Sequence, residues 1–269
     1  MRYSRIKLRY RALKDIIFPE NPVNTFRGAM GYRLKARSCI QKNRLDLNCL
    51  GCPVQSSCAY ALCFETGYGS SGASKIVNGG QDFPKLLIID SSFPGGKLLQ
   101  EGSLLDFHVT LVSRGVEILP HLIIAADEVG RHGFTRARTP CSLVEVSDAV
   151  LQKVLWQEGA EDLAFPEIKN LELAEPSLDQ LDSQTVSLDF ITPVAFKELK
   201  GQNVSLEPDF NRIIGSLLRR YSFFMMLDGK PLKWQFNKIT ELAGKVKTRR
   251  KHLQPVTWER YSTRQKQRI

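Results

Sequence analysis

The stretch Arg5-Ile6-Lys7-Leu8-Arg9-Tyr10-Arg11-Ala12 alternates strictly between cations and apolar residues. Because successive side chains of a β-strand point to opposite faces, a period of two predicts a strand with one buried and one wet face. Four cations side by side on the wet face repel one another unless that face meets anions or carboxylates of neighbouring strands.

A helix is expected after this strand. A Pro/Asn turn at residues 19–22 precedes Asn24, a good N-cap residue, near which the helix is predicted to begin. Residues four apart share a helix face, and two such faces are evident. One carries Phe26, Met30 and Leu34, and the other Arg27, Gly31 and Lys35.

The remainder of the first half reads as a loop followed by more strands. Residues 40–80 hold four cysteines and a Gly/Ser-rich stretch at 67–72 with no clear period, which predicts a loop. Alternating or short apolar runs predict further strands, and an apolar run with Pro120 in its first turn predicts a helix. The strands are expected at 85–90, 104–112 and 142–146, and the helix at 119–129.

A second unit begins after an acidic connection at residues 157–184. It is expected to start with a strand at 186–196, followed by an amphipathic helix from Asp209 and a further helix at 235–246. Both halves therefore open strand-then-helix, which suits two ferredoxin-like units in an α+β protein. The sequence predicts a first domain at 1–178 with a cysteine-rich loop after its first helix, and a basic, incomplete second domain at 179–269.

Charge is unevenly distributed along the chain. Of a net +10, residues 1–40 hold ten cations and two anions, and residues 201–269 hold fifteen cations and five anions. The segment 41–200 is acidic, with thirteen cations and twenty-one anions. Two basic ends predict two surfaces that can face one polyanion, with solvated charges as the alternative.

The composition excludes several classes of protein. At 269 residues, 42% hydrophobic and 25% charged, the sequence is typical of a globular protein. No apolar run reaches the roughly 18 residues that span a bilayer, and residues 1–5 lack the apolar core of a signal peptide. We therefore expect a cytoplasmic protein without a membrane partner, whose cysteines are thiols or metal ligands.

Four of the six cysteines have the spacing of a metal site. Cys39, Cys49, Cys52 and Cys58 are separated by nine, two and five residues. Four thiolates close in sequence suit tetrahedral, structural zinc. An iron–sulfur cluster or free buried thiols are the alternatives. Cys141 stands apart beside a predicted strand and is expected in the core.

Several short motifs, taken in order, resemble the CRISPR-associated endoribonucleases that process precursor RNA, within the RAMP superfamily. They begin with Phe26–Tyr32 (FRGAMGY), the four cysteines and Cys58–Glu65 (CAYALCFE). They continue with Gly130–Phe134 (GRHGF), Leu188–Pro193 (LDFITP), Leu218–Arg220 and Arg260–Gln265 (RYSTRQ). This sequence departs from that pattern in having no histidine before Phe107, and it stops at Ile269 without a glycine-rich closing segment.

The resemblance implies two ferredoxin-like domains and metal-independent cleavage within CRISPR repeats. In that reaction the ribose 2′-hydroxyl attacks the adjacent phosphorus and leaves a 2′,3′-cyclic phosphate, so the cysteines are not the catalytic centre. Proton transfer and charge stabilisation are needed instead. The candidate catalytic residues are Tyr32, Lys35 and His132. The candidate RNA-binding residues are Arg5, Lys7, Arg9, Arg11, Arg27, Arg131, Arg136, Arg138, Arg249, Arg250 and Lys251.

Two other functions compete with the nuclease. One is a non-catalytic RAMP subunit that holds RNA in a CRISPR effector complex, and the missing early histidine favours it. The other is a zinc-stapled nucleic-acid module unrelated to CRISPR. The expected partners are CRISPR repeat RNA, other CRISPR-associated proteins and a second copy in a homodimer. His108 is expected at the surface, and His121 in the core or as a helix cap.

Overall fold

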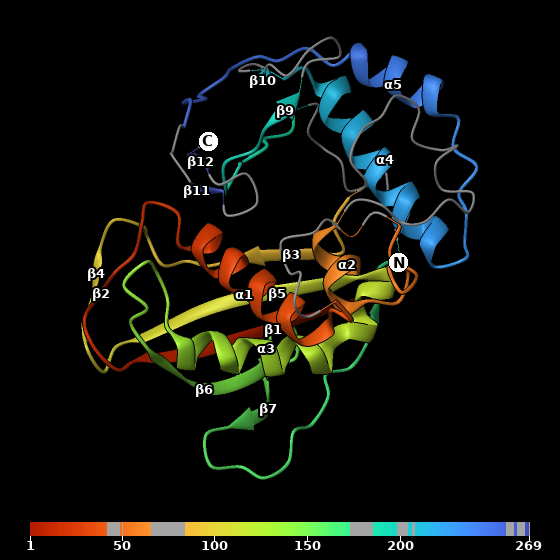
Figure 1. The fold of residues 1–269 in the computed structure, drawn as a ribbon. Coiled ribbons are helices and arrows are strands. Elements are labelled where there is room, and N and C mark those ends of the chain that lie inside the picture. Colours follow the sequence, from red (N-terminus) through yellow and green to blue (C-terminus); the bar gives the residue numbers. More distant parts are fainter. Residues whose placement is uncertain are drawn as a thin grey trace. The chain divides into compact units, whose positions relative to one another are not determined.

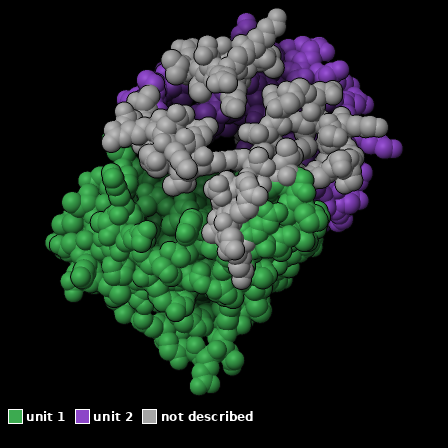
Figure 2. Space-filling view, in the orientation of Figure 1, with its two compact units in different colours: residues 1–170, 258–269 green, residues 171–257 purple. Residues whose placement is uncertain are grey.

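The computed structural model describes residues 1–41, 49, 51–65, 84–172, 185–197, 204–205, 208–256, 261–262 and 267–268. Its internal contacts divide the chain into two compact units (Figure 2). The first comprises residues 1–170 with 258–269, and the second residues 171–257. The division after Asn170 falls inside the acidic connection at 157–184, whereas residues 258–269 group with the first unit rather than the second.

The first unit is built on one antiparallel sheet (Figure 1). Its strands are β1 (Arg2–Ala12), β3 (Leu87–Asp90), β5 (Leu104–Val112), β6 (Cys141–Asp148) and β7 (Lys153–Gln157), in the order β3-β5-β1-β6-β7. Helix α1 (Pro22–Ser38) lies between β1 and β3 along the chain. The 3-10 helix η3 (Ser113–Ile118) and helix α3 (Leu119–His132) lie between β5 and β6. This β-α-β-β-α-β order with β1 in the middle is ferredoxin-like, as the sequence predicts.

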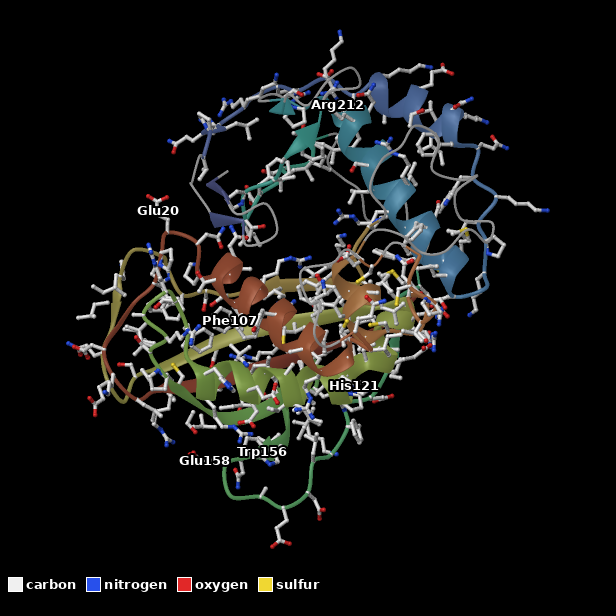
Figure 3. The ribbon with its side chains drawn as sticks, in the orientation of Figure 1. Glu20, Phe107, His121, Trp156, Glu158 and Arg212 are labelled. Carbon is white, nitrogen blue, oxygen red and sulfur yellow. The ribbon has the colours of Figure 1, made fainter. Side chains whose placement is uncertain are left out.

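Short strands complete this unit. β8 (Lys169–Asn170) pairs with the start of β1, and β2 (Ile16–Ile17) pairs with β4 (Leu98–Leu99). β11 (Tyr261–Ser262) pairs with β12 (Gln267–Arg268). Trp156 and Glu158 lie on and just after β7, at the edge of the sheet (Figure 3).

The core lies between the sheet and the helices. Ile6, Leu8 and Tyr10 of β1 are fully buried, as their alternation predicts. Tyr10 donates a hydrogen bond from its hydroxyl to the Ala126 carbonyl of α3 at 2.9 Å. The rings of Phe26 in α1 and Phe107 in β5 stack with centroids 4.2 Å apart. The apolar half of β1 therefore anchors both helices on one face of the sheet, and the cations of β1 lie on the other face.

Helix α1 begins slightly earlier than predicted. Asn21 is its N-cap and accepts a hydrogen bond from the Asn24 backbone N–H at 3.1 Å, with Pro22 in the first helical position. Proline suits that position because its nitrogen has no hydrogen to leave unpaired and its φ is already helical. Phe26, Met30 and Leu34 are buried, as predicted for that face.

The prediction of a loop throughout residues 40–80 is wrong at residues 59–64, which form helix α2 (Ala59–Phe64). Four of its six residues are buried. The helix forms because it packs on the second face of α1: Gly31 has no side chain, and a Cβ there would come within 2.9 Å of the Phe64 ring. Tertiary packing therefore stabilises a segment too short to be helical alone. The predicted Gly/Ser-rich loop at 67–72 lies outside the described residues.

The second unit contains the two predicted helices, α4 (Phe210–Leu227) and α5 (Phe236–Gly244). The strand predicted at 186–196 is wrong, since residues 185–195 carry no strand and only Phe196 enters the short β9 (Phe196–Lys197), paired with β10 (Val204–Ser205). Val186, Leu188 and Phe190, expected inward, are exposed. Alternation specifies a strand only where a neighbouring strand covers it, and none does so among the described residues.

Among the helices that the structure describes, none has both the length and the apolar character needed to cross a membrane.

Candidate functional site

The three candidate catalytic residues lie on two helices of the first unit: Tyr32 and Lys35 are one turn apart on α1, and His132 is on α3. Tyr32 is 59% exposed on α1, with the Arg33 guanidinium 5.2 Å from the centre of its ring. Lys35 lies on the α1 face that packs against α2, with its Nζ 5.0 Å from the centre of the Tyr60 ring. His132 is exposed at the C-terminal end of α3.

Two contacts relate the C-terminal end of α3 to α1. The turn after His132 packs through Phe134 on Phe26, with ring centroids 6.1 Å apart. Lys35 comes nine residues after Phe26, which is about 14 Å along a helix axis at 1.5 Å per residue. Arg37, near the end of α1, is ion-paired with Glu128 one turn before His132, so α3 also contacts the end of α1 that carries Lys35. Among the contacts of the described residues, none joins Lys35 to His132.

His132 has a defined ring orientation. Its Nδ1 lies 2.9 Å from the backbone carbonyl of Glu128. A carbonyl oxygen only accepts hydrogen bonds, so Nδ1 carries the proton and Nε2 of the neutral ring keeps its lone pair. The exposed imidazole is thus held in the tautomer that can take up a proton at Nε2.

The chain folds back tightly after His132. Gly133 adopts φ +87°, and a Cβ there would lie 2.2 Å from the Arg138 carbonyl. Phe134 and Thr139 form a two-way bridge at 2.9 and 3.0 Å between their N–H and C=O groups. Phe134 itself is fully buried and holds the turn in the core. Only glycine fits this position because both the backbone angle and the close approach exclude a side chain.

This turn presents basic side chains beside the histidine. Arg131, Arg136 and Arg138 are all exposed. Arg131 is paired with Asp127 one helical turn earlier. Within the residues that the structure describes, neither Arg136 nor Arg138 has a carboxylate partner. We call residues 131–138 the His132 turn; it combines a proton acceptor with two uncompensated guanidinium groups.

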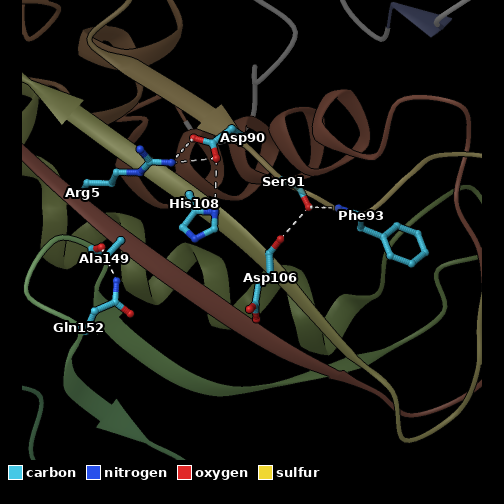
Figure 4. A network of polar contacts seen from close by, with 8 residues as sticks. All are labelled: Arg5, Asp90, Ser91, Phe93, Asp106, His108, Ala149 and Gln152. Atoms are coloured by element: carbon cyan, nitrogen blue, oxygen red, sulfur yellow. Dashed lines mark hydrogen bonds and ion pairs between the residues drawn. The ribbon is translucent and has the colours of Figure 1, made fainter. Parts of the chain in front are cut away.

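The cations of β1 differ, because each one meets carboxylates of the neighbouring elements. Arg9 donates two hydrogen bonds to Asp106 at 2.8 and 2.9 Å. Arg5 donates two to Asp90, at 3.0 and 3.1 Å, as Figure 4 shows. Two further ion pairs, at 3.0 and 3.1 Å, are Lys7–Glu145 and Arg11–Glu158. The open sheet face predicted as a basic wall is therefore balanced by four carboxylates.

These pairs change the titration of the carboxylates. Partial burial acts to raise the pKa of Asp106, but the hydrogen bond and charge of Arg9, aided by Lys7, outweigh it and lower that pKa. For Glu145, partial burial likewise opposes the effect of Lys7, and the pKa is again lowered. Both groups are thus held in the charged form that pairs with β1.

His108 belongs to the same face. Its Nδ1 lies 3.3 Å from an Asp90 oxygen that also contacts Arg5, and Figure 4 shows the three side chains together. The alternation of residues 104–112 indicates that His108 faces the open side, but its carboxylate partner comes from the separate strand β3. His121, expected in the core or as a helix cap, is exposed near the start of α3.

The four clustered cysteines line one cavity beside α1 and α2, together with Lys35 and Tyr60. Burial raises the pKa of Cys49 to about 11, with Glu65 raising it further and Lys35 opposing. Tyr60 donates a hydrogen bond to buried Glu65 at 3.1 Å. Cys141 is 1% exposed in β6, as expected for a core residue.

The other candidate RNA-binding residues are placed separately. Arg27 lies with its guanidinium 5.1 Å from the centre of the Phe64 ring, at the α1–α2 contact. Arg249, Arg250 and Lys251 are exposed in the second unit, after α5. Sequence patterns do not indicate Asp90, Asp106, Glu145 and Glu158 as partners of β1, because each lies on another element.

We compared this chain with curated proteins and with models of protein families. Among curated proteins, none is significantly similar to this chain. A family model described as AF_1859_N, N-terminal domain, matches residues 1–168, which cover the ferredoxin-like sheet, the cysteine-lined cavity and the His132 turn. The match spans more than half of the sequence, and the chain therefore belongs to the AF_1859_N family, a CRISPR-associated, Cas6-like family.

Proposed function

We propose that this protein binds precursor CRISPR transcripts and cleaves them within their repeats, without a catalytic metal. Membership of a CRISPR-associated family supports the substrate class. The observation that carries the chemistry is the His132 turn, where Nδ1 is bonded to the Glu128 carbonyl and two arginines are uncompensated within the described residues.

In the proposed reaction, Nε2 of His132 takes the proton of a ribose 2′-hydroxyl. The 2′-oxygen forms a bond to the adjacent phosphorus as the bond from phosphorus to the 5′-oxygen breaks. The 5′-oxygen takes up a proton from water and the protonated His132 returns its proton to water, so the products are a 2′,3′-cyclic phosphate and a 5′-hydroxyl. Arg136 and Arg138 stabilise the charge that gathers on the phosphorane oxygens.

The test is cleavage of a labelled CRISPR repeat RNA in excess chelator. We expect a single cut whose upstream product ends in a 2′,3′-cyclic phosphate. A cut that disappears with chelator, or products ending in a 3′-hydroxyl, would contradict the proposal.

A second function, RNA binding without cleavage in an effector complex, is favoured by one specific observation. Among the contacts of the described residues, none joins His132 to Tyr32 or Lys35, so His132 has no second titratable partner from the predicted set there. Repeat RNA that binds with a steep salt dependence but stays intact over long incubation would support this scaffold function.

A further inference from the structure

The four clustered cysteines join two helices of the first unit. Cys39 directly follows α1 and Cys58 directly precedes α2, while Cys49 and Cys52 lie on the segment between them. All four side chains line the same cavity. The Cys58 Sγ lies 4.0 Å from the Ser38 carbonyl oxygen, so the start of α2 is beside the end of α1. Thiols that are up to nineteen positions apart in sequence therefore face one space.

The segment that carries Cys52 and Cys58 is a series of tight turns. Cys52 donates its N–H to the Cys49 carbonyl at 3.2 Å, around Gly51 with φ +76°. Cys58 donates its N–H to the Val54 carbonyl at 2.8 Å. No side chain of residues 51–58 is fully buried. Such a segment has little apolar burial of its own and requires another source of stability.

We propose that Cys39, Cys49, Cys52 and Cys58 bind one structural zinc ion that fastens the end of α1 to the start of α2. Four sulfur donors with no fifth position suit tetrahedral Zn²⁺ and leave it no open site for substrate. Because such a metal ion has no open position for substrate, it takes no part in the proposed cleavage.

Zinc binding requires the thiols to move inward and to lose their protons. As they stand, no three His, Cys, Asp or Glu side chains in the described parts of the chain already form a group that could hold a metal ion. Zinc–sulfur bonds of about 2.3 Å place neighbouring sulfurs about 3.8 Å apart in a tetrahedron. Because the thiols already border one cavity, we expect side-chain rotation and shifts of the turns to bring the sulfurs together.

The same geometry assigns a positioning role to Lys35. Four thiolates around Zn²⁺ carry a net charge of −2, and Lys35 borders the cavity while its ammonium lies over Tyr60. A cation held beside the thiolates stabilises the charged cluster. Lys35 therefore stabilises the metal site in this proposal, rather than serving as a general base.

The first experiment measures metal in the purified full-length chain. We expect about one equivalent of zinc by elemental analysis, and cobalt(II) substitution should give the thiolate-to-metal absorption of a tetrahedral four-sulfur site. Cys52→Ser should lower the metal content and weaken that absorption. Cys141→Ser, at a buried cysteine in β6, is the matched control and should retain the metal.

If Cys52→Ser fails to fold, a measurement on the wild-type protein still tests the proposed zinc site. Titration with a mercurial thiol reagent should release zinc in step with modification of four thiols. Folded, metal-free wild-type protein whose melting temperature does not respond to added zinc would overturn the proposal. Iron with inorganic sulfide in place of zinc would overturn it as well.

Lys35 is tested by chelator competition. Loss of an outer-shell partner weakens metal sites by about 10- to 100-fold, so Lys35→Met should lower zinc affinity within that range and Lys35→Arg should restore it. A shift of the cobalt charge-transfer band in Lys35→Met separates an electrostatic role from packing. Equal affinity and an unshifted band in Lys35→Met would remove Lys35 from the site.

Discussion

Arg9 and Asp106 lie opposite each other in the β1–β5 register and are joined by two hydrogen bonds, at 2.8 and 2.9 Å. Three further ion pairs lie along β1, namely Arg5–Asp90, Lys7–Glu145 and Arg11–Glu158. The positive charges on this face of the sheet are therefore balanced by carboxylates. We therefore expect Arg136 and Arg138, which are uncompensated within the described residues, to bind phosphate more effectively than the paired cations of β1.

The pairing of β1 predicts sensitivity to acid. The pKa of Asp106 is lower in the folded protein than in the unfolded chain, so the pair contributes stability at neutral pH that is lost as pH falls through the folded pKa. We expect the free energy of unfolding to decline below about pH 4, near the usual pKa of a carboxyl group.

Denaturant titrations across pH 2–7 would measure this decline. Asp106→Asn should flatten the acid limb, because its stability no longer depends on that proton. Glu161→Gln, at an exposed carboxylate, is the control and should leave the limb unchanged. An acid limb of the same steepness in Asp106→Asn would contradict the prediction.

Gly133→Ala should destabilise the His132 turn. The φ of +87° and the approach of the Arg138 carbonyl together predict a loss of about 1–3 kcal/mol or more in the free energy of unfolding. Gly28→Ala is the matched control, since Gly28 lies in α1 with open space around its Cα and should gain roughly 1 kcal/mol. Chemical denaturation distinguishes the two, and equal effects would show that the turn is not strained by a side chain.

His132→Gln should remove cleavage and keep RNA binding. General-base catalysis contributes about 10²- to 10⁴-fold, so the single-turnover rate should fall within that range. His121→Gln provides the control, because His121 is also exposed on α3 but lies near its opposite end. A full rate in His132→Gln would assign the proton transfer to another group, whereas loss in both variants would indicate damage to α3.

Arg136→Ala should weaken repeat RNA binding more than Arg11→Ala. Arg136 has no carboxylate partner within the described residues, whereas Arg11 is paired with Glu158 at 3.1 Å. Each phosphate contact to a single strand contributes about 0.7 to the slope of log affinity against log salt. Binding measured from low to moderate salt should show that loss of slope for Arg136→Ala and not for Arg11→Ala. A larger loss for Arg11→Ala would indicate that the RNA binds to the sheet face that carries β1.

Much of the fold can be predicted from local patterns in the sequence. The alternation in β1 and β5, the apolar face of α1 and the amphipathic α4 each indicate an element that the structure contains. These patterns work because each element buries one face against the others. The prediction fails for α2, which packs on Gly31 of α1, and for residues 186–195, whose alternation has no described strand to pair with.

Less of the candidate site could be predicted from the sequence. The GRHGF motif indicates a turn after a helix. Only the structure shows that Nδ1 of His132 contacts the Glu128 carbonyl, which leaves Nε2 able to accept a proton. The face shared by Arg27, Gly31 and Lys35 is visible at helical spacing. Its partner α2, and hence the position of Lys35 beside the cysteines, depends on a segment more than twenty residues away.

The sequence by itself determined that β1 has an apolar side and a cationic side, because the period of two is a property of the backbone. It also determined which cysteines are close enough along the chain to share a site. Only the tertiary structure decided what the cations face: Asp90, Asp106, Glu145 and Glu158 come from other elements. Electrostatic pairing depends on distances in space, and those distances follow from sheet register and helix packing rather than from local composition.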